Sequence, residues 1–115
     1  MQKLGNNSIG VEQGESVLFS DYKHGGQMWT GEGNRERRQR VTFSESFRKQ
    51  PVVHCSLSMW DVDSSANVRA DVSAECIDGA GFDIVFRTWG DTRIARARIG
   101  WMAIGELKNS DDWEV

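Results

Sequence analysis

Residues 67–76, Asn-Val-Arg-Ala-Asp-Val-Ser-Ala-Glu-Cys, alternate strictly between polar and apolar side chains. A period of two is typical of a β-strand that buries one face and leaves the other in solvent. The apolar face comprises Val68, Ala70, Val72, Ala74 and Cys76. The polar face comprises Asn67, Arg69, Asp71, Ser73 and Glu75. This stretch therefore predicts a strand in a sheet that packs on one side against a core.

Five further segments repeat the alternation, and each predicts a strand: 11–20, 40–44, 53–60, 82–89 and 93–105. The breaks between them are rich in residues that form turns, as in Asp78-Gly79-Ala80-Gly81. No stretch of ten or more residues has a helical period. Six short strands, each with one apolar face, predict an all-β fold, either an antiparallel sandwich or a barrel.

The chain of 115 residues has room for a single domain, with a core over about 11–106 and an acidic tail over 107–115. A net charge of −3 gives no general attraction to nucleic acid or to an anionic membrane. No apolar run approaches the roughly 20 residues of a membrane-spanning helix. No signal peptide is visible at the amino terminus. A cytoplasmic protein, a removed leader and export by a non-classical route stay as alternatives.

Neither catalysis nor a cofactor is indicated. His24 and His54 fall in different predicted elements, and neither lies in a nucleophile motif. Residues 61–65 begin like a calcium-binding loop, but Ala66 and Val72 stand where such a loop needs glycine and glutamate. We therefore predict a protein that is not an enzyme and that holds no metal or other cofactor.

The two cysteines, Cys55 and Cys76, have neither metal-ligand spacing nor a nearby histidine that could pair with them. Both fall on apolar faces of predicted strands, where a thiol behaves as a small hydrophobic group. This position favours buried free thiols over a disulfide.

One basic cluster, Asn34-Arg35-Glu36-Arg37-Arg38-Gln39-Arg40, precedes a predicted strand. Such a cluster is suited to phosphate groups, but Glu36 interrupts it and the chain as a whole is acidic. We favour a solvated loop that leads into an edge strand.

Trp89 lies on the polar side of its strand, together with Asp83, Val85 and Arg87, while Phe82, Ile84 and Phe86 face the other way. Arg69 also faces outward. An exposed aromatic ring suits the apolar face of a pyranose, and an arginine or a carboxylate suits its hydroxyls. The same residue types anchor contacts between subunits, so the residues alone leave both interpretations open.

Three stretches extend these observations: 41–53, 57–69 with Asn67-Val68-Arg69, and 81–106 with Thr88-Trp89-Gly90-Asp91-Thr92. In order and spacing they resemble the H-type lectin domain family, over about residues 29–106. The resemblance implies a six-stranded antiparallel β-sandwich that forms trimers. It implies binding of galactose or N-acetylgalactosamine between neighbouring subunits, without a cofactor and without turnover.

The resemblance also implies which residues contact the sugar. Trp89 matches the tryptophan of the family's Thr-Trp motif, Arg69 matches a strand arginine, and Glu32 falls at an acidic loop position. Gly90 stands where snail members of the family have a sugar-contacting histidine, and we include it with Asp91 in the expected site.

Two departures from the family pattern bear on sugar preference. Gly90 replaces the histidine, and Ala95 stands where snail lectins have a tyrosine. Asp91, Arg35 or Trp29 could supply replacement contacts.

A structural role is the alternative, as a trimeric assembly module of an adhesin or phage tail with a degenerate sugar site. Under either reading, His54, Ser56, Ser58 and Trp60 share an outward face that could form the subunit contact. Stacking of two trimers into a hexamer is a further possibility that the residues leave open.

Overall fold

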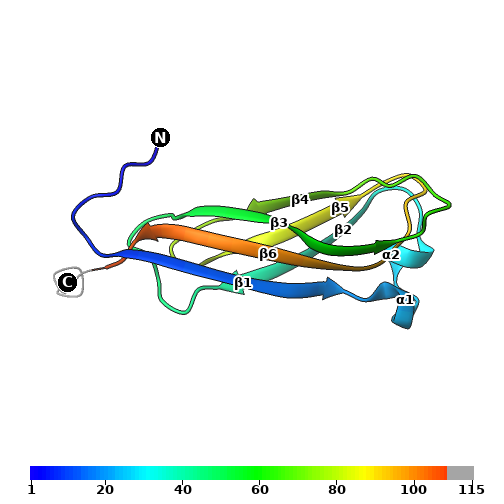
Figure 1. Cartoon of the computed structure of the whole chain (residues 1–115), viewed down its shortest axis with the longest axis horizontal. Helices are drawn as coiled ribbons and strands as arrows, with labels where there is room; N and C mark the ends of the chain where they lie inside the picture. Colours follow the sequence, from blue (N-terminus) through cyan, green and yellow to red (C-terminus); the bar gives the residue numbers. More distant parts are fainter. Residues whose placement is uncertain (109–115) are drawn as a thin grey trace.

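The computed structural model describes residues 1–108 and is almost entirely β-structure (Figure 1). Two single-turn helices follow the first strand, α1 (Asp21–His24) and α2 (Gln27–Thr30). The strands are β1 (Ile9–Phe19), β2 (Arg35–Thr42), β3 (Val52–Val62), β4 (Asp71–Glu75), β5 (Gly81–Thr88) and β6 (Ile94–Glu106).

The strands form two three-stranded sheets, in the orders β1-β6-β3 and β2-β5-β4, and every neighbouring pair is antiparallel. The sheets lie face to face, and the helices cap one end of the pair (Figure 1). The prediction of a six-stranded antiparallel sandwich is confirmed, and the alternative of a barrel is wrong.

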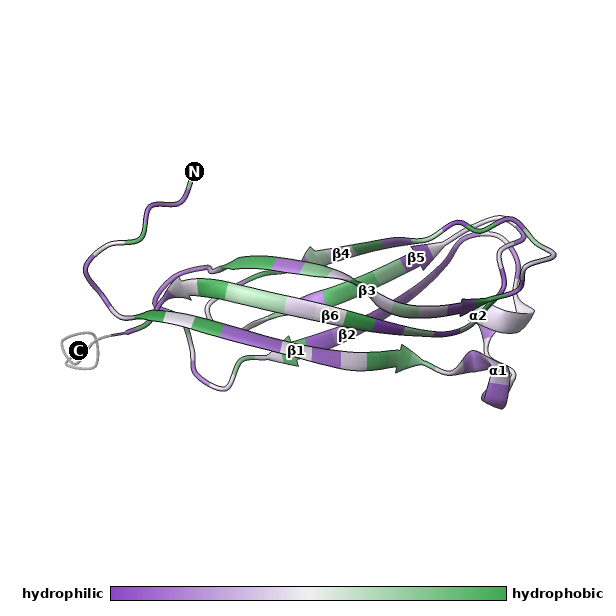
Figure 2. Cartoon of the chain, viewed as in Figure 1, coloured by the Kyte–Doolittle hydropathy of each residue, from purple (hydrophilic) through white to green (hydrophobic). Residues whose placement is uncertain are grey.

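The core lies between the inner faces of the two sheets. Phe82, Ile84 and Phe86 of β5 are fully buried there, opposite Ala97 and Ile99 of β6. The bands of hydrophobic and hydrophilic residues along the strands in Figure 2 show the alternation that produces these faces. The predicted inward residues of the central strands are therefore the core residues.

Val85 is an exception to the alternation, because it faces outward on β5 and is nevertheless fully buried. Its neighbours in register are Arg38 on β2 and Ser73 on β4. The Arg38 guanidinium forms ion pairs across the sheet with Glu75 and Asp83, so its aliphatic stem extends over Val85. Long charged side chains thus cover part of the outer face.

The basic cluster is a strand rather than a loop, which corrects the prediction for residues 35–39. Strand β2 pairs with β5 from Arg35↔Thr88 to Thr42↔Gly81 and forms an edge of its sheet, as predicted. Successive side chains of a strand point to opposite faces, and the arginines find acidic partners on both faces. Arg37 turns inward to Asp21, while Arg38 and Arg40 pair with outer-face carboxylates.

Strand β4 is shorter than the predicted 67–76, since only residues 71–75 pair with β5. The chain leaves the ladder after Glu75, and Cys76 adopts a left-handed conformation with φ of 50°. Cys76 is therefore exposed, against our prediction, while Cys55 on β3 is half-buried. Both thiols are free, as predicted.

Residues 5–8 meet residues 106 and 107 at one end of the β1-β6-β3 sheet. The buried Glu106 carboxylate accepts hydrogen bonds from the Gly5 N–H and from Asn7. Leu107 donates its N–H to the Ser8 carbonyl and bridges to Phe47. The rest of the predicted acidic tail, 109–115, lies outside the described residues.

Candidate functional site

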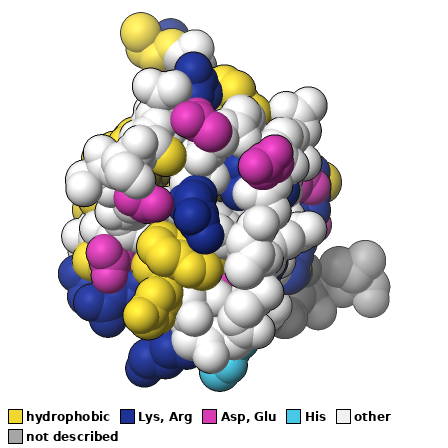
Figure 3. Space-filling view, turned by 90° about the vertical axis from the view of Figure 1, so that its right-hand side faces the viewer, with side chains coloured by type: hydrophobic (Ala, Val, Ile, Leu, Met, Phe, Trp, Pro, Cys, Tyr) yellow, Lys and Arg dark blue, Asp and Glu magenta, His cyan; other side chains and the backbone are white. Residues whose placement is uncertain are grey.

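The predicted sugar-binding residues lie at the end of the sandwich where β5 ends and β2 begins. Figure 3 looks at this end and shows hydrophobic side chains gathered beside basic and acidic ones. The backbone hydrogen bond from Gly33 N to Gly90 O, 2.9 Å, joins the loop before β2 to the loop after β5. Two loops that are far apart in the sequence therefore meet here.

Arg69 and Asp91 form the polar part of the site. Arg69 Nη1 donates to Asp91 Oδ1 at 3.0 Å, and Asn67 Nδ2 lies 3.4 Å from both carboxylate oxygens. Desolvation opposes ionisation of Asp91, but the hydrogen bonds from Asn67 and Arg69 outweigh it and lower the pKa of this carboxyl. At neutral pH the site thus presents an ionised guanidinium–carboxylate pair.

Two buried threonines hold the Arg69 segment in place. Thr92 Oγ1 accepts the Arg69 N–H at 3.0 Å and donates to the Asn67 carbonyl at 2.6 Å. Thr88 Oγ1 donates to the Arg69 carbonyl. Residues 67–69 consequently follow β5 through side-chain hydroxyls instead of a backbone ladder, which explains why β4 begins only at Asp71.

Gly90 allows the arginine to lie directly against the backbone. Its φ is +70°, a conformation that side-chain-bearing residues rarely adopt, and a Cβ there would lie 3.1 Å from Arg69 Nη1. A histidine at this position would strain the turn and displace the guanidinium. Glycine at position 90, where snail lectins have histidine, is therefore needed for Arg69 to lie where it does.

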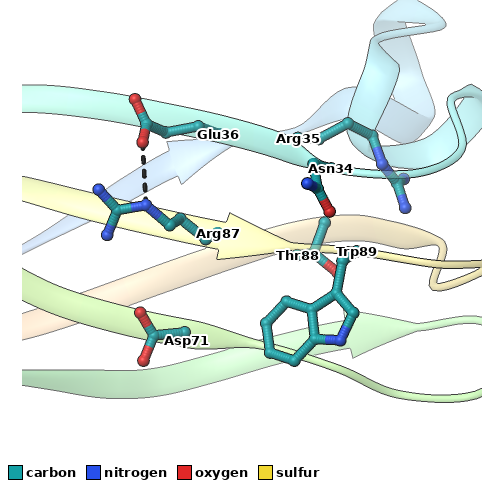
Figure 4. A pocket seen from close by; sticks show the side chains of 7 residues that line it. All are labelled: Asn34, Arg35, Glu36, Asp71, Arg87, Thr88 and Trp89. Atoms are coloured by element: carbon teal, nitrogen blue, oxygen red, sulfur yellow. Dashed lines mark ion pairs between the residues drawn. The ribbon is translucent and has the colours of Figure 1, made fainter.

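Trp89 follows the last residue of β5, and its side chain is exposed, with a relative accessibility of 42%, as predicted. It borders a groove of about 460 Å³ on the outer face of the β2-β5-β4 sheet (Figure 4). The groove is lined by Asn34, Arg35, Glu36, Asp71, Arg87, Thr88 and Trp89. Asn34, Glu36, Asp71, Arg87 and Thr88 were not among the predicted site residues. The alternation did contain their signal, since Asp71 shares a predicted face with Arg69 and Arg87 shares one with Trp89.

Arg35 does not replace the missing sugar contacts, because it is buried and its guanidinium holds the surrounding loops together. It donates to the carbonyls of Gln27, Met28, Gly33 and Gly90. Burial lowers the pKa of Arg35, and the nearby charge of Glu32 partly opposes this shift. Arg35 is therefore a positioning residue for the site.

Trp29 is also unsuited to stack on a sugar. The Arg93 guanidinium covers its ring at 4.9 Å from the centroid, and Arg93 Nε donates to the Trp29 carbonyl. Tyr22 contacts the ring edge-on at 5.2 Å. Ala95, in place of the family tyrosine, is buried in β6. Of the three residues that could have compensated, only Asp91 lies beside Arg69.

Glu32 lies exposed in the loop between α2 and β2. No hydrogen bond or ion pair to another of residues 1–108 involves its carboxylate. The structure therefore does not join Glu32 to Arg69 or Trp89 within one chain, although its loop is bonded to Gly90.

An ion-pair network covers the outer face of the β2-β5-β4 sheet beyond the groove. Glu75 receives hydrogen bonds from Arg87, Ser73 and Arg38, which lower its pKa to about 2. Arg87 also pairs with Glu36 at 3.0 Å. The network fixes the Arg87 side chain that forms one wall of the groove.

Among residues 1–108, no group of three or more histidine, cysteine, aspartate or glutamate side chains is arranged to hold a metal ion. No helix in this part of the chain has the length and apolar character needed to cross a membrane. This end of the sandwich carries an exposed tryptophan, a guanidinium–carboxylate pair and a groove. Together they are typical of a carbohydrate-binding protein.

Comparison with known families gives the class a name. A model of the H-type lectin domain matches residues 38–104, more than half of the chain. The chain therefore belongs to the H-type lectin domain family, and membership supports a role in carbohydrate binding.

A relative covers the whole chain. The protein named "ATP synthase subunits region ORF 7" from Fuscovulum blasticum is 56% identical over 115 residues, which is 100% of this chain and 99% of that protein. The similarity to this relative therefore extends beyond residues 38–104, which the family model matches.

Solved structures agree on the fold. Two structures of discoidin II from Dictyostelium discoideum match with TM-scores of 0.74 and 0.75, at 23% and 24% identity, over 86% and 95% of this chain. This chain spans only 37% and 40% of those discoidin chains. The tailspike protein of Pseudomonas phage LKA1 matches with a TM-score of 0.53 at 13% identity, over 88% of this chain and 15% of that one.

Proposed function

We propose that the protein is a multivalent lectin that binds galactose- or N-acetylgalactosamine-type glycans between the subunits of a homotrimer, without catalytic turnover. The observation that carries this proposal is the exposed Trp89 ring at the same end of the sandwich as the Arg69–Asp91 pair. Family membership supports the carbohydrate-binding class.

The chemistry of these groups suits a sugar. The indole of Trp89 offers an apolar surface to the C–H face of a pyranose. Only Nη1 of Arg69 is bonded within residues 1–108, so its other side-chain N–H groups are available to adjacent hydroxyls. Asp91 holds the guanidinium and can itself accept a hydroxyl hydrogen bond.

A site between subunits would use Glu32. Its carboxylate is exposed and unpaired within the described part of the chain, and Glu32 of a neighbouring copy could complete the polar ring around the sugar. The proposed site residues are therefore Arg69, Trp89, Gly90 and Asp91 of one copy, with Glu32 of the next.

The outer face of the β1-β6-β3 sheet supports the trimer. Register joins Val11, Ile104 and Val52 in one row across three strands, and Val11 and Val52 are 61% and 54% exposed. Met102 lies two residues along β6 from this row, and Trp60 of β3 is 49% exposed. Val11, Ile104, Val52 and Met102 thus form an apolar group at one end of this face, of a kind typical of surfaces that another subunit covers.

Val11→Asp tests the trimer. A buried charge in the contact face should convert trimers to monomers, which light scattering after size exclusion would measure. Ala80→Asp, in the exposed turn between β4 and β5, is the control and should leave the trimer intact. A wild-type protein that is monomeric at micromolar concentration would contradict the assembly.

The assembly-module alternative makes a different prediction for sugar binding. The similarity to the phage tailspike protein concerns the fold alone. A lectin and an assembly module would both use the same contact face between subunits. A glycan array separates the two. We expect the wild type to bind galactose-type glycans and Trp89→Ala to lose this binding while remaining folded and trimeric.

Tyr22→Ala is the matched control for that array, because Tyr22 is an exposed aromatic residue outside the proposed site. It should bind as the wild type does. A wild type that binds no glycan, or a Trp89→Ala protein that binds normally, would favour the assembly module.

A further inference from the structure

The groove beside Trp89 lies on the same surface as Arg69. Strands β2, β5 and β4 place Glu36, Arg87 and Asp71 in one row across the outer face. Trp89 is the next outward residue after Arg87, and Arg69 lies against the adjacent Gly90, where a Cβ would be 3.1 Å from Arg69 Nη1. Successive rows on one face lie roughly 6–7 Å apart, close to the length of one pyranose unit. A glycan seated at Arg69 and Trp89 could therefore extend into the groove.

Asp71 is an exposed carboxylate in this groove. Arg87 lies directly beside it in register, yet its guanidinium pairs with Glu36 at 3.0 Å and with Glu75 at 2.8 Å. The Asp71 carboxylate consequently has no hydrogen-bond or ion-pair partner among the described residues. Figure 4 shows it across from the Trp89 indole, with Arg87 between Asp71 and Glu36.

The polar groups of the groove are suited to a neutral sugar. Asp71 can accept two hydroxyl hydrogen bonds, and Asn34 has both donors and an acceptor. The groove volume of about 460 Å³ lies within the roughly 300–1,000 Å³ of small-molecule sites. Because Asp71 and Glu36 both carry negative charge, an acidic sugar would be repelled.

We propose that this groove is a second subsite, in which Asp71 binds the neutral sugar unit linked to the one held at Arg69 and Trp89. The inference rests on the lectin function proposed above. The proposed contact face belongs to the other sheet and includes none of the residues that line the groove. Trp89 then borders both subsites, while Asp71 acts only in the second.

Calorimetric titration tests this assignment with galactose, N-acetylgalactosamine and a set of neutral disaccharides that end in either sugar. The best disaccharide should bind the wild type about tenfold more tightly than its monosaccharide, as expected for added hydrogen bonds to a charged group. Asp71→Ala should remove this tenfold gain and leave monosaccharide binding unchanged. Glu45→Ala, an exposed carboxylate in the loop after β2, is the control and should keep the gain.

Asp71→Asn tests the charge. It should improve binding of a disaccharide whose second unit is glucuronic acid, because repulsion decreases while the size of the side chain is retained. Circular dichroism should show that both Asp71 variants are folded.

The outcomes separate this inference from the function on which it rests. A wild type that binds every disaccharide no better than its monosaccharide would overturn the subsite and leave the lectin function. An Asp71→Ala protein that also loses monosaccharide binding would overturn the division into two subsites. A wild type that binds no sugar would overturn both proposals.

Discussion

Thr92→Val is the substitution that most directly tests how the fold positions the sugar site. Threonine and valine have nearly the same shape, so the change removes a hydroxyl and creates no cavity. Thr92 is fully buried, and its hydroxyl links the Arg69 N–H to the Asn67 carbonyl. The substitution therefore leaves both backbone groups without their partner.

The structure sets the size of the effect. Asn67 is exposed, so water can replace the hydroxyl at its carbonyl, whereas the Arg69 N–H is part-buried beside Thr92. One unsatisfied buried donor costs about 1–3 kcal/mol. We expect a loss of about 2 kcal/mol in the free energy of unfolding. For a domain of this size that corresponds to a decrease in Tm of roughly 8 °C.

Two measurements check the prediction. Chemical denaturation gives the change in the free energy of unfolding. It should be done at one fixed protein concentration, because association of subunits makes stability depend on concentration. Hydrogen exchange should show faster exchange at the Arg69 amide. Sugar binding should weaken even though Arg69, Asp91 and Trp89 are all present.

Thr42→Val is the control, because Thr42 is exposed at the end of β2, and its stability should change by less than about 0.5 kcal/mol. A Thr92→Val protein with wild-type stability and an Arg69 amide that is still protected would refute the role of the buried hydroxyl.

Three shorter predictions concern charge and metal. Arg69→Lys should weaken sugar binding by about tenfold in titration calorimetry, because an ammonium cannot reproduce the planar fork of donors; wild-type affinity would contradict the role of Arg69. Hydrogen bonds from Arg87, Ser73 and Arg38 lower the pKa of Glu75 from 4.5 to about 2. Its ion pairs therefore stabilise the fold fully above pH 4.5, and this contribution is lost as the pH falls toward about 2. Denaturation of Glu75→Gln should thus show a deficit at pH 7 that shrinks below pH 4, and a deficit independent of pH would contradict the assignment. EDTA should leave glycan binding unchanged, and a loss that calcium restores would reveal a metal site.

Much of the sandwich could be predicted from the sequence, because burial of one sheet face imposes a period of two on each strand. The inward set Phe82, Ile84 and Phe86 and the outward Trp89 follow from that period alone. The prediction failed where other contacts replaced the pattern. Val85 lies beside Arg38, whose aliphatic stem covers it, and residues 35–39 form a strand because each arginine finds a carboxylate or carbonyl partner.

Alternation along each strand is enough to assign a side chain to one face of its sheet, and it identifies most core residues, with Val85 as an exception. Which outward residues are neighbours depends instead on how the strands pair in space. Alternation assigns a side chain to a face, but the register between strands brings Arg87 beside both Glu36 and Asp71. The geometry of its guanidinium then pairs Arg87 with Glu36 and Glu75 and leaves Asp71 free. Which carboxylates pair with Arg87 depends on distances between side chains of different strands. The alternation along one strand carries no information about those distances.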